Sequence, residues 1–385
     1  MASTVASNGS SETTSDQLDV LFVMQHLQAG GAERVTILLA NDLVARGIRV
    51  GIAVYAKRGE FLERIDPRIA LIEIGGSGWF AAILPLSRLI RQTRPSAVVG
   101  VMVSCNVAAV VAGRIARTGA RIVLTEHNQV DKSADYFGGN SRSYRAIRWT
   151  YPWADAIVCV SDGVRDSLCR YSGMKPDKMR VIHNPIVSDD LIDKAGQPCP
   201  HPWANDDGVP LILAVGRLAT AKNYPMMLRA FGILRQQRPA RLLILGNGGA
   251  RDRLSALITE LGLSEDVEMY GYTSNPYAFM SRARLFVLSS SWEGFPTVLV
   301  EALACGSPAV ATDCPSGPRE ILLDGDLGEL VPVGDEQAFA DAMMRALDDP
   351  PCRDTLMARG RSFSVGRAAD TYASLLLGDG RRAAI

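Results

Sequence analysis

DVLFVMQHL, at Asp19–Leu27, is an apolar run of strand length, and the amphipathic stretch after it runs from Ala32 to Ala45 and ends at Gly47. A buried strand followed by a helix is the unit that builds parallel sheets covered by helices on both faces. Further strands are predicted in the same alternation at Arg49–Tyr55, Ala97–Val103, Arg121–Thr125, Ala156–Val160 and Arg180–His183. The first half of the chain is therefore predicted to form a doubly wound α/β domain.

A second series of strands begins after a break in this pattern. Residues 189–208 are rich in Asp, Gly and Pro, which is the composition of a connector. Alternation resumes with VPLILAV, and strands are predicted at Val209–Val215, Arg241–Leu245, Val267–Tyr270, Leu285–Ser289 and Ala309–Ala311. The predicted map is a disordered tail at 1–17, Rossmann-like domains at 18–187 and 209–362, a linker at 188–208, and a terminal helix and tail at 363–385. Ligands of such sheets bind beyond the carboxyl ends of the strands.

Composition argues against several classes of partner. Lys plus Arg and Asp plus Glu both number 41, so no basic surplus favours a nucleic acid. The first 17 residues are polar and lack the apolar stretch of a secretory signal. The apolar run at 97–113 is interrupted by Ser104 and Asn106 and suits a buried strand and helix better than a membrane span. Seven cysteines without a CxxC pair fit reduced thiols, so a cytoplasmic protein is expected.

Two segments with chemical potential follow strands of the first domain. Gly30 and Gly31 lie between the first strand and its helix, where free amides suit an anion and two glycines allow close approach of a ligand. A tight turn is the alternative. Glu126-His127-Asn128 closes the strand from Arg121, and His127 can donate a hydrogen bond to a sugar hydroxyl. A capping or core histidine is the alternative there.

Cations follow the first strand of the second domain. Arg217 offers a planar fork for phosphate oxygens, and Lys222 offers a mobile point charge. A diphosphate leaving group requires such a pair of cations. The alternative is that Arg217 and Lys222 are ordinary charged residues on the surface. The neighbouring strand exit, Gly246-Asn247-Gly248, adds a loop whose backbone is accessible.

The most informative segment is SSSWEGFPTVLVEALACG at Ser289–Gly306. A strand ends, a loop carries Glu293, and a helix begins around Pro296 and Thr297. Proline suits a first helical turn, and the free amides of that turn can hold a phosphate. Glu293 and Glu301 flank these amides and can accept hydrogen bonds from hydroxyls on either side of a diphosphate.

Glu293-x7-Glu301 resembles the signature of the retaining family 4 glycosyltransferases, which have the two-domain B-type fold. The GGAE loop, the EHN strand exit, VGRL with Lys222, and a late helix around Phe363–Leu377 occur in matching order. Residues 313–322 and the EHN exit also resemble the members that build lipid-linked oligosaccharides and surface polysaccharides from UDP-sugars. The resemblance implies two domains facing each other across a cleft, with the terminal helix crossing back to the first domain.

Site roles also come from this resemblance. Arg217 and Lys222 would neutralise the diphosphate, Gly31 and the helix start at Thr297 and Val298 would hold phosphate, and Glu301 would bind the ribose. Glu293 and His127 would contact the transferred sugar. The catalytic residues would be His127, Arg217, Lys222 and Glu293. The donor-binding residues would be Gly30, Gly31, Arg217, Lys222, Gly246, Asn247, Gly248, Tyr272, Glu293, Gly294, Phe295, Pro296, Thr297, Val298 and Glu301.

The implied chemistry needs no cofactor and no metal. Asp324-Gly325-Asp326 spells the DxD of metal-dependent enzymes, but it follows a predicted helix at Arg319–Leu323, so a glycine turn is favoured. No clear carboxylate nucleophile is present, which favours front-face displacement. A nucleotide-sugar epimerase of the same fold and a non-catalytic nucleotide-sugar-binding protein remain as alternatives.

Two segments of the first domain suggest peripheral membrane contact. Residues 79–94 join bulky apolar side chains to three arginines, and residues 142–153 interleave arginines with Tyr and Trp. This composition suits an anionic membrane surface and a lipid-linked saccharide acceptor. The alternative, favoured by the zero net charge, is an ordinary pair of helices packed on the sheet.

Overall fold

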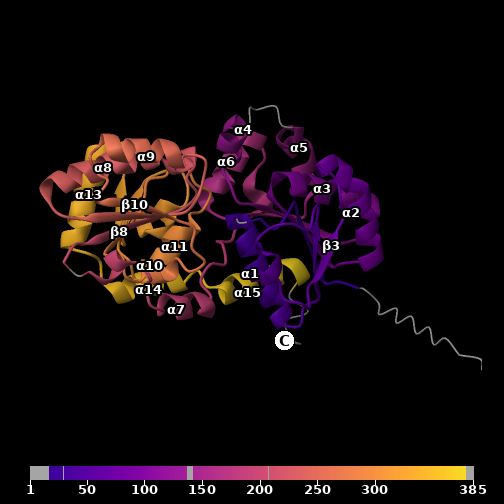
Figure 1. Cartoon of the computed structure of the whole chain (residues 1–385). Coiled ribbons are helices and arrows are strands. Elements are labelled where there is room, and N and C mark those ends of the chain that lie inside the picture. Colours follow the sequence, from indigo (N-terminus) through magenta and orange to yellow (C-terminus); the bar gives the residue numbers. More distant parts are fainter. Residues whose placement is uncertain (1–16, 29, 137–141, 207, 379–385) are drawn as a thin grey trace, which may run out of the picture.

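The computed structural model describes residues 17–28, 30–136, 142–206 and 208–378. Nearly all of the predicted tail, and residues 379–385 beyond the last helix, lie outside these ranges. Each half of the chain forms a parallel sheet with helices on both faces, and the two halves lie side by side (Figure 1). The predicted fold class, two doubly wound domains of the B type, is confirmed.

The first domain is built on a seven-stranded sheet with the order β3-β2-β1-β4-β5-β6-β7. Its strands are β1 (Val20–Met24), β2 (Val50–Val54), β3 (Ala70–Glu73), β4 (Ala97–Val101), β5 (Arg121–Glu126), β6 (Ala156–Cys159) and β7 (Met179–Val181). Its helices are α1 (Gly31–Ala45), α2 (Trp79–Thr93), α3 (Met102–Ala116), α4 (Val130–Tyr136), α5 (Arg142–Thr150) and α6 (Asp162–Ser172). The edge strand β3 was not predicted. Its burial pattern is only partial, so its four residues lack a continuous apolar signal.

The second domain is built on a six-stranded sheet with the order β10-β9-β8-β11-β12-β13. Its strands are β8 (Leu211–Val215), β9 (Arg241–Leu245), β10 (Val267–Gly271), β11 (Leu285–Leu288), β12 (Ala309–Thr312) and β13 (Glu329–Val331). Its helices are α8 (Tyr224–Gln237), α9 (Arg251–Glu260), α10 (Tyr277–Met280), α11 (Thr297–Ala304), α12 (Pro318–Ile321), α13 (Glu336–Asp348) and α14 (Arg353–Arg361). The three-residue edge strand β13 was also not predicted.

The connector contains more regular structure than its composition suggested. Helix α7 (Asp189–Ala195) starts at Ser188, whose hydroxyl accepts a hydrogen bond from the amide of Leu191. A 3-10 turn follows at Pro202–Asn205. The Ser188 cap therefore starts a short helix within the connector, and this helix ends at Ala195 with Gly196 as its C-cap, before the prolines begin.

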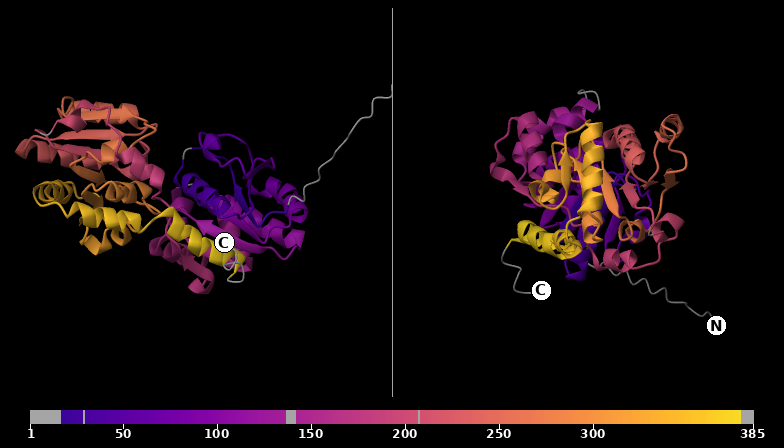
Figure 2. Two further views of the ribbon diagram at one scale, coloured as in Figure 1. Left: turned by 90° about the horizontal axis from the view of Figure 1, so that it is seen from below. Right: turned by 90° about the vertical axis from the view of Figure 1, so that its left-hand side faces the viewer.

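Two crossings between the domains lie next to each other. The amides of Ile186 and Val187 donate to the carbonyl of Phe363 at 3.0 and 3.1 Å, and the amide of Val365 donates back to Val187 at 3.0 Å. Helix α15 (Val365–Leu377), the yellow helix beside the first domain in Figure 2, then packs against α1. Its Tyr372 is buried in the core of the first domain. The end of the second domain is thus tied to the first.

Buried apolar side chains form a continuous core through the contact between the domains. One cluster runs from Leu21 and Val98 of the first sheet, through Val187 and Phe363, to Leu213 of the second sheet. Within the described ranges, no helix is both long and apolar enough to span a bilayer.

Candidate active site in the cleft between the domains

The loop after β1 leaves an open position at the start of α1. Gly30 is the N-cap residue, and no side chain caps this helix. A Cβ added to Gly31 would meet nothing within 4 Å, so a ligand can approach its backbone. A Cβ on Gly30 would lie 2.2 Å from the carboxylate of Glu33, which therefore covers that residue. Ala29 lies outside the described residues.

Glu33 links this loop to the second domain electrostatically. Burial raises the pKa of Glu33, while its own backbone amide, His26 and Arg217 oppose that rise. Arg217 is exposed, directly after Gly216 at the end of β8, and it is close enough to influence Glu33 across the cleft. The loops after β1 and β8, where phosphate-binding residues are predicted, thus interact electrostatically through Glu33 and Arg217.

The loop after β11 brings a predicted pair of residues together. The ammonium of Lys222 lies 2.6 Å from Glu293 Oε1, and the hydroxyl of Ser290 donates to the same oxygen at 2.6 Å. The Glu293 side chain is only 13% exposed. The two side chains predicted to hold a diphosphate and a sugar thus form an ion pair at the cleft.

The second carboxylate of the motif is also paired, with a residue that the sequence did not indicate. Glu301, on α11, is buried and bonded to the guanidinium of Arg34 on α1. Arg34 also donates to the hydroxyl of Tyr277 at 2.5 Å. Arg34 directly follows the GGAE sequence, but its partner Glu301 lies 267 positions further on, so pattern alone could not pair them.

Glycines shape the loops after β8 and β9. A Cβ on Gly246, whose φ is +139°, would lie 2.1 Å from the carbonyl oxygen of Gly216. A Cβ on Gly248 would lie 2.4 Å from the carbonyl oxygen of Leu218. Only glycine permits these two strand exits to touch. Asn247 between them is exposed, and Tyr272, just beyond β10, is 63% exposed.

The start of α11 is open to a ligand through its backbone. No side chain caps it, and Thr297 and Val298 at its first positions are half-buried. Phe295 and Pro296 are buried, and the Phe295 ring stacks on His183 of the first domain at a centroid distance of 5.1 Å. The Phe295 side chain therefore packs between the domains, and only its backbone is left for a donor.

His127 lies at the end of β5 beside the EGFP loop. Its Nε2 is 3.1 Å from Thr125 Oγ1, and its ring lines a small cavity with Thr36 and Asn184. Burial lowers its pKa to about 4, against a smaller opposing effect of Asn184, so the ring is neutral at pH 7. Its carbonyl oxygen would lie 1.9 Å from a Cβ on Gly294, so the two domains touch at this glycine.

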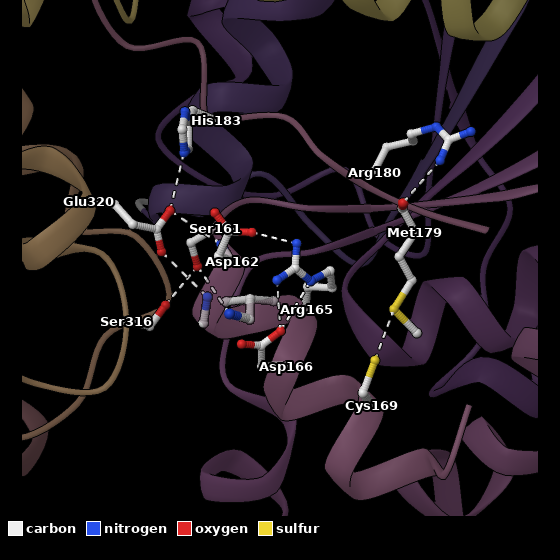
Figure 3. Close-up of polar contacts among 12 residues, drawn as sticks. Ser161, Asp162, Arg165, Asp166, Cys169, Met179, Arg180, His183, Ser316 and Glu320 are labelled. Carbon is white, nitrogen blue, oxygen red and sulfur yellow. Dashed lines mark hydrogen bonds and ion pairs between the residues drawn. The ribbon is translucent and has the colours of Figure 1, made fainter. Parts of the chain in front are cut away.

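A second set of contacts joins the domains next to Gly294. Ser161 and Ser316, one from each domain, lie 2.6 Å apart (Figure 3). Both hydroxyls also reach the Gly294 carbonyl, at 2.9 and 2.7 Å. Glu320 accepts hydrogen bonds from the first amides of α6 and lies 3.2 Å from His183 Nε2. The structure therefore holds the EGFP loop against the first domain.

An open pocket lies beside the predicted sugar end of the site. Its volume is about 820 Å³, and its lining includes Trp292, Asp313 and Arg319 with Lys132 from α4 of the other domain. No sequence pattern indicated this pocket, because it joins the ends of β11, β12 and β13 to a helix of the first domain. Asp324 also lines it and is paired with Arg319 at 3.3 Å. Gly325 has a φ of +106°, so the predicted glycine turn in the DGD sequence is confirmed.

Two parallel α/β domains with open glycine loops, cations and carboxylates at their facing strand exits are the arrangement of B-fold glycosyltransferases. Residues 29–190 match the model of Glycosyltransferase Family 4, and residues 200–363 match the model of Glycosyl transferases group 1. The chain belongs to the glycosyltransferase family whose two domains these models describe.

Individual proteins show the same relationship. The chain is 34% identical over 236 residues to N-acetylgalactosamine-N,N'-diacetylbacillosaminyl-diphospho-undecaprenol 4-alpha-N-acetylgalactosaminyltransferase of Campylobacter jejuni, covering 60% of this chain and 62% of that protein. It is 30% identical over 229 residues to the lipopolysaccharide core biosynthesis glycosyltransferase LpsE of Rhizobium meliloti, covering 58% and 64%. These matches thus span less than two thirds of each relative's length.

A solved structure shares the whole fold. Anabaena HepE in complex with UDP superposes with a TM-score of 0.76 at 21% identity, covering 93% of this chain and 99% of that one. At this identity the likeness shows the fold alone.

Proposed function

We propose that this protein is a retaining, metal-independent glycosyltransferase. It moves a hexose or N-acetylhexosamine from a UDP-sugar to a saccharide acceptor, in the synthesis of a lipid-linked glycan or polysaccharide. The observation that carries the proposal is the meeting of four groups at one cleft. They are Arg217, the Lys222–Glu293 pair, the uncapped start of α11, and Glu301.

The cations suit a departing diphosphate. Negative charge on the β-phosphate grows as the bond to the sugar breaks, and fixed positive groups that meet this growing charge lower the barrier. Arg217 and Lys222 supply two such charges, and the free amides at Thr297 and Val298 supply hydrogen bonds. These groups perform the task that a divalent cation performs in metal-dependent transferases.

The environment of Glu293 supports a front-face mechanism. Its Oε1 already accepts from Lys222 and Ser290, and a carboxylate held in this way is a poor nucleophile. In the proposed step the acceptor oxygen bonds to the anomeric carbon on the side from which the diphosphate leaves. The acceptor proton passes to a phosphate oxygen of the leaving group. Neutral His127 serves as a hydrogen-bond donor to the sugar rather than as an acid.

An acceptor is what separates a transferase from a nucleotide-sugar epimerase. The open pocket is lined by Ser291 and Trp292, the two residues before Glu293, and gives a saccharide room next to the transferred sugar. The name of the Campylobacter relative specifies an undecaprenyl-diphosphate acceptor, and HepE was solved with UDP. The pocket and these two relatives together favour transfer from a UDP-sugar to a lipid-linked saccharide over epimerisation or binding alone.

A transfer assay tests this function. The purified protein is incubated with radiolabelled UDP-sugars, with a polyprenyl-diphosphate saccharide present or absent, in chelator or with added Mn²⁺. We expect label in the lipid fraction, an α-anomeric product from an α-linked donor, and equal rates in chelator. Interconversion of free UDP-sugars without an acceptor would establish an epimerase, and loss of activity in chelator with rescue by Mn²⁺ would refute metal independence.

We also propose that one face of the first domain contacts an anionic membrane. Residues 79–94, 102–117 and 142–153 contain eight arginines, all exposed, and no Asp or Glu. The most exposed large apolar side chains of the first domain lie on the same elements, with Phe80 at 76% and Trp149 at 78%. Helices α2, α3 and α5 pack side by side (Figure 1). Exposed arginines and aromatic rings on neighbouring helices suit anionic headgroups.

Co-sedimentation with liposomes tests this contact. Binding should rise with the fraction of anionic lipid, fall with salt, and drop strongly in a Phe80→Ser, Trp149→Ser variant. Leu323→Ser, which removes a 42%-exposed apolar side chain from the second domain, is the matched control and should bind like the unchanged protein. No sedimentation with anionic liposomes at low salt would refute the membrane contact.

A further inference from the structure

The Arg34 side chain extends across the cleft, and each of its two terminal nitrogens contacts a different side chain of the second domain. Its Nη1 is bonded to Glu301 Oε1 on α11, and its Nη2 donates to the Tyr277 hydroxyl on α10 at 2.5 Å. The guanidinium also lies over the Tyr277 ring, 5.7 Å from its centroid. Three contacts from one side chain fix its position, because a planar fork held at two points has little rotational freedom left.

The Glu301 carboxylate depends on this partner. Its side chain is only 2% exposed, whereas that of Arg34 is 22% exposed. A carboxylate taken out of water needs a charged or hydrogen-bonding partner, since an unpaired buried charge is strongly unfavourable. Within the described part of the chain, Arg34 supplies the ion pair of Glu301. Only one oxygen of Glu301 takes part in that contact, and a carboxylate can accept several hydrogen bonds.

Arg34 and the glycine loop share one turn of helix. The Arg34 amide donates to the Gly30 carbonyl at 3.0 Å, so the guanidinium and the open backbone at Gly31 are part of one rigid element. When α1 approaches α11, Gly31 and Arg34 arrive together. Two parts of a donor, its diphosphate and its ribose, would therefore meet the first domain through the same helical turn.

We propose that Arg34 is a positioning residue for recognition of the donor's ribose. It orients Glu301 so that the other carboxylate oxygen accepts the ribose hydroxyls, and it does so only when the two domains are closed. The inference rests on the proposed function, in which Glu301 binds the ribose. Its consequence is that discrimination for ribose hydroxyls depends on a residue that does not touch the nucleotide.

Calorimetric titration with UDP and with 2′,3′-dideoxy-UDP tests this role. For the unchanged protein we expect UDP to bind at least about tenfold more tightly, because a hydrogen bond to a charged acceptor is worth at least that much. Arg34→Ala should weaken UDP binding and reduce the ratio of the two affinities to about one. Arg34→Lys keeps a cation that reaches Glu301 but cannot also hold Tyr277. The affinity ratio of this variant should therefore lie between that of the unchanged protein and that of Arg34→Ala.

Arg64→Ala is the control for loss of a nearby positive charge. Arg64 lies over the Phe61 ring, and no hydrogen bond or ion pair joins it to Glu301. The ratio of the affinities for UDP and 2′,3′-dideoxy-UDP should therefore be the same in Arg64→Ala as in the unchanged protein. An unaltered ratio in Arg34→Ala, or in Arg34→Lys if the alanine variant does not fold, would overturn the inference. Equal binding of both nucleotides by the unchanged protein would overturn the ribose role of Glu301 and the inference with it. Absence of UDP binding would instead remove the proposed function itself.

Discussion

Glu126 shows how a residue in a site motif can serve the core instead. It stands beside His127 in the EHN strand exit, but its side chain is buried and bonded to Tyr151 and Asn106, with Asn106 Nδ2 at 2.8 Å from Oε1. Burial raises the pKa of Glu126 to about 7, and the bonds from Tyr151 and Asn106 only partly oppose that rise. Glu126 therefore supports the strand exit that presents His127 and does not line the cleft.

A pH dependence of stability follows from that raised pKa. A carboxyl with a folded pKa of about 7 and an ordinary value of 4.5 contributes stability that is complete below pH 4.5 and is lost as pH rises through 7. The lowered pKa of His127 acts in the opposite direction, since its contribution is lost as pH falls from 6.5 through 4. The two slopes therefore offset each other in the unchanged protein.

Glu126→Gln separates the two effects. The amide keeps the size of the side chain but cannot ionise, so the stability that Glu126 loses between pH 4.5 and 7 is not lost in the variant. The change in the free energy of unfolding from pH 4.5 to pH 7 should therefore be up to about 3 kcal/mol more favourable in the variant than in the unchanged protein. Thermal unfolding measured across this range checks the difference curve. Parallel curves for the two proteins would contradict the buried, neutral state of Glu126.

The sequence could place individual site residues but not pair them across domains. Lys222 and Glu293 come from strand exits of one domain, and strand order alone places those exits side by side because β8 and β11 are neighbours. Arg34 and Glu301 belong to different domains, and their meeting depends on how the sheets dock. The inward orientation of the Phe295 ring has the same origin, since His183 of the first domain covers it.

At the scale of elements, the sequence predicted the central strands and the edge strands β7 and β10, but it missed the other two edge strands, β3 and β13. Strands such as β1, β4 and β11 are buried along their whole length and appear as unbroken apolar runs. The edge strands β3 and β13 are short and partly exposed, so alternation with helices could not reveal them. Missing these two strands did not change the predicted fold class. An edge strand widens a sheet but does not alter the order of the central strands that end at the cleft.

The contact between β5's exit and the EGFP loop depends on a single glycine. A Cβ on Gly294 would lie 1.9 Å from the His127 carbonyl oxygen, and backbone on both sides cannot give way. Gly294→Ala should therefore disfavour the closed arrangement by roughly 1–3 kcal/mol and reduce donor turnover at least several-fold. Turnover of the UDP-sugar, together with the radius of gyration measured by X-ray scattering with and without UDP, checks both effects.

Gly232→Ala is the control for this substitution. Gly232 lies within α8, where an added Cβ would make only an ordinary contact of 3.8 Å with Leu263, and alanine favours a helix. Its turnover should match that of the unchanged protein. Normal turnover and normal compaction in Gly294→Ala would show that this close approach is not required for function.

At the scale of the whole molecule, the two connections between the domains lie together, so they form a natural hinge for movement of one domain relative to the other. The crossings at Ile186–Val187 and at Phe363–Val365 hydrogen-bond to each other, and α15 is buried against α1. The domains are also bridged by polar contacts, among them Arg34 with Glu301 and Glu320 with the start of α6. Polar bridges can exchange with a ligand more readily than an apolar core, so donor binding and closure are expected to be coupled.

The most direct test of the central claim, a nucleotide-diphosphate donor gripped between the domains, is calorimetric titration with UDP in the absence of metal. We expect one UDP to bind per chain, with affinity reduced by orders of magnitude in Arg217→Ala and Lys222→Ala, since each removes a charge that faces the diphosphate. Arg238→Ala, which removes only an exposed pair with Asp348, should bind UDP normally. No binding of UDP by the unchanged protein, or undiminished binding in both cleft variants, would contradict the account.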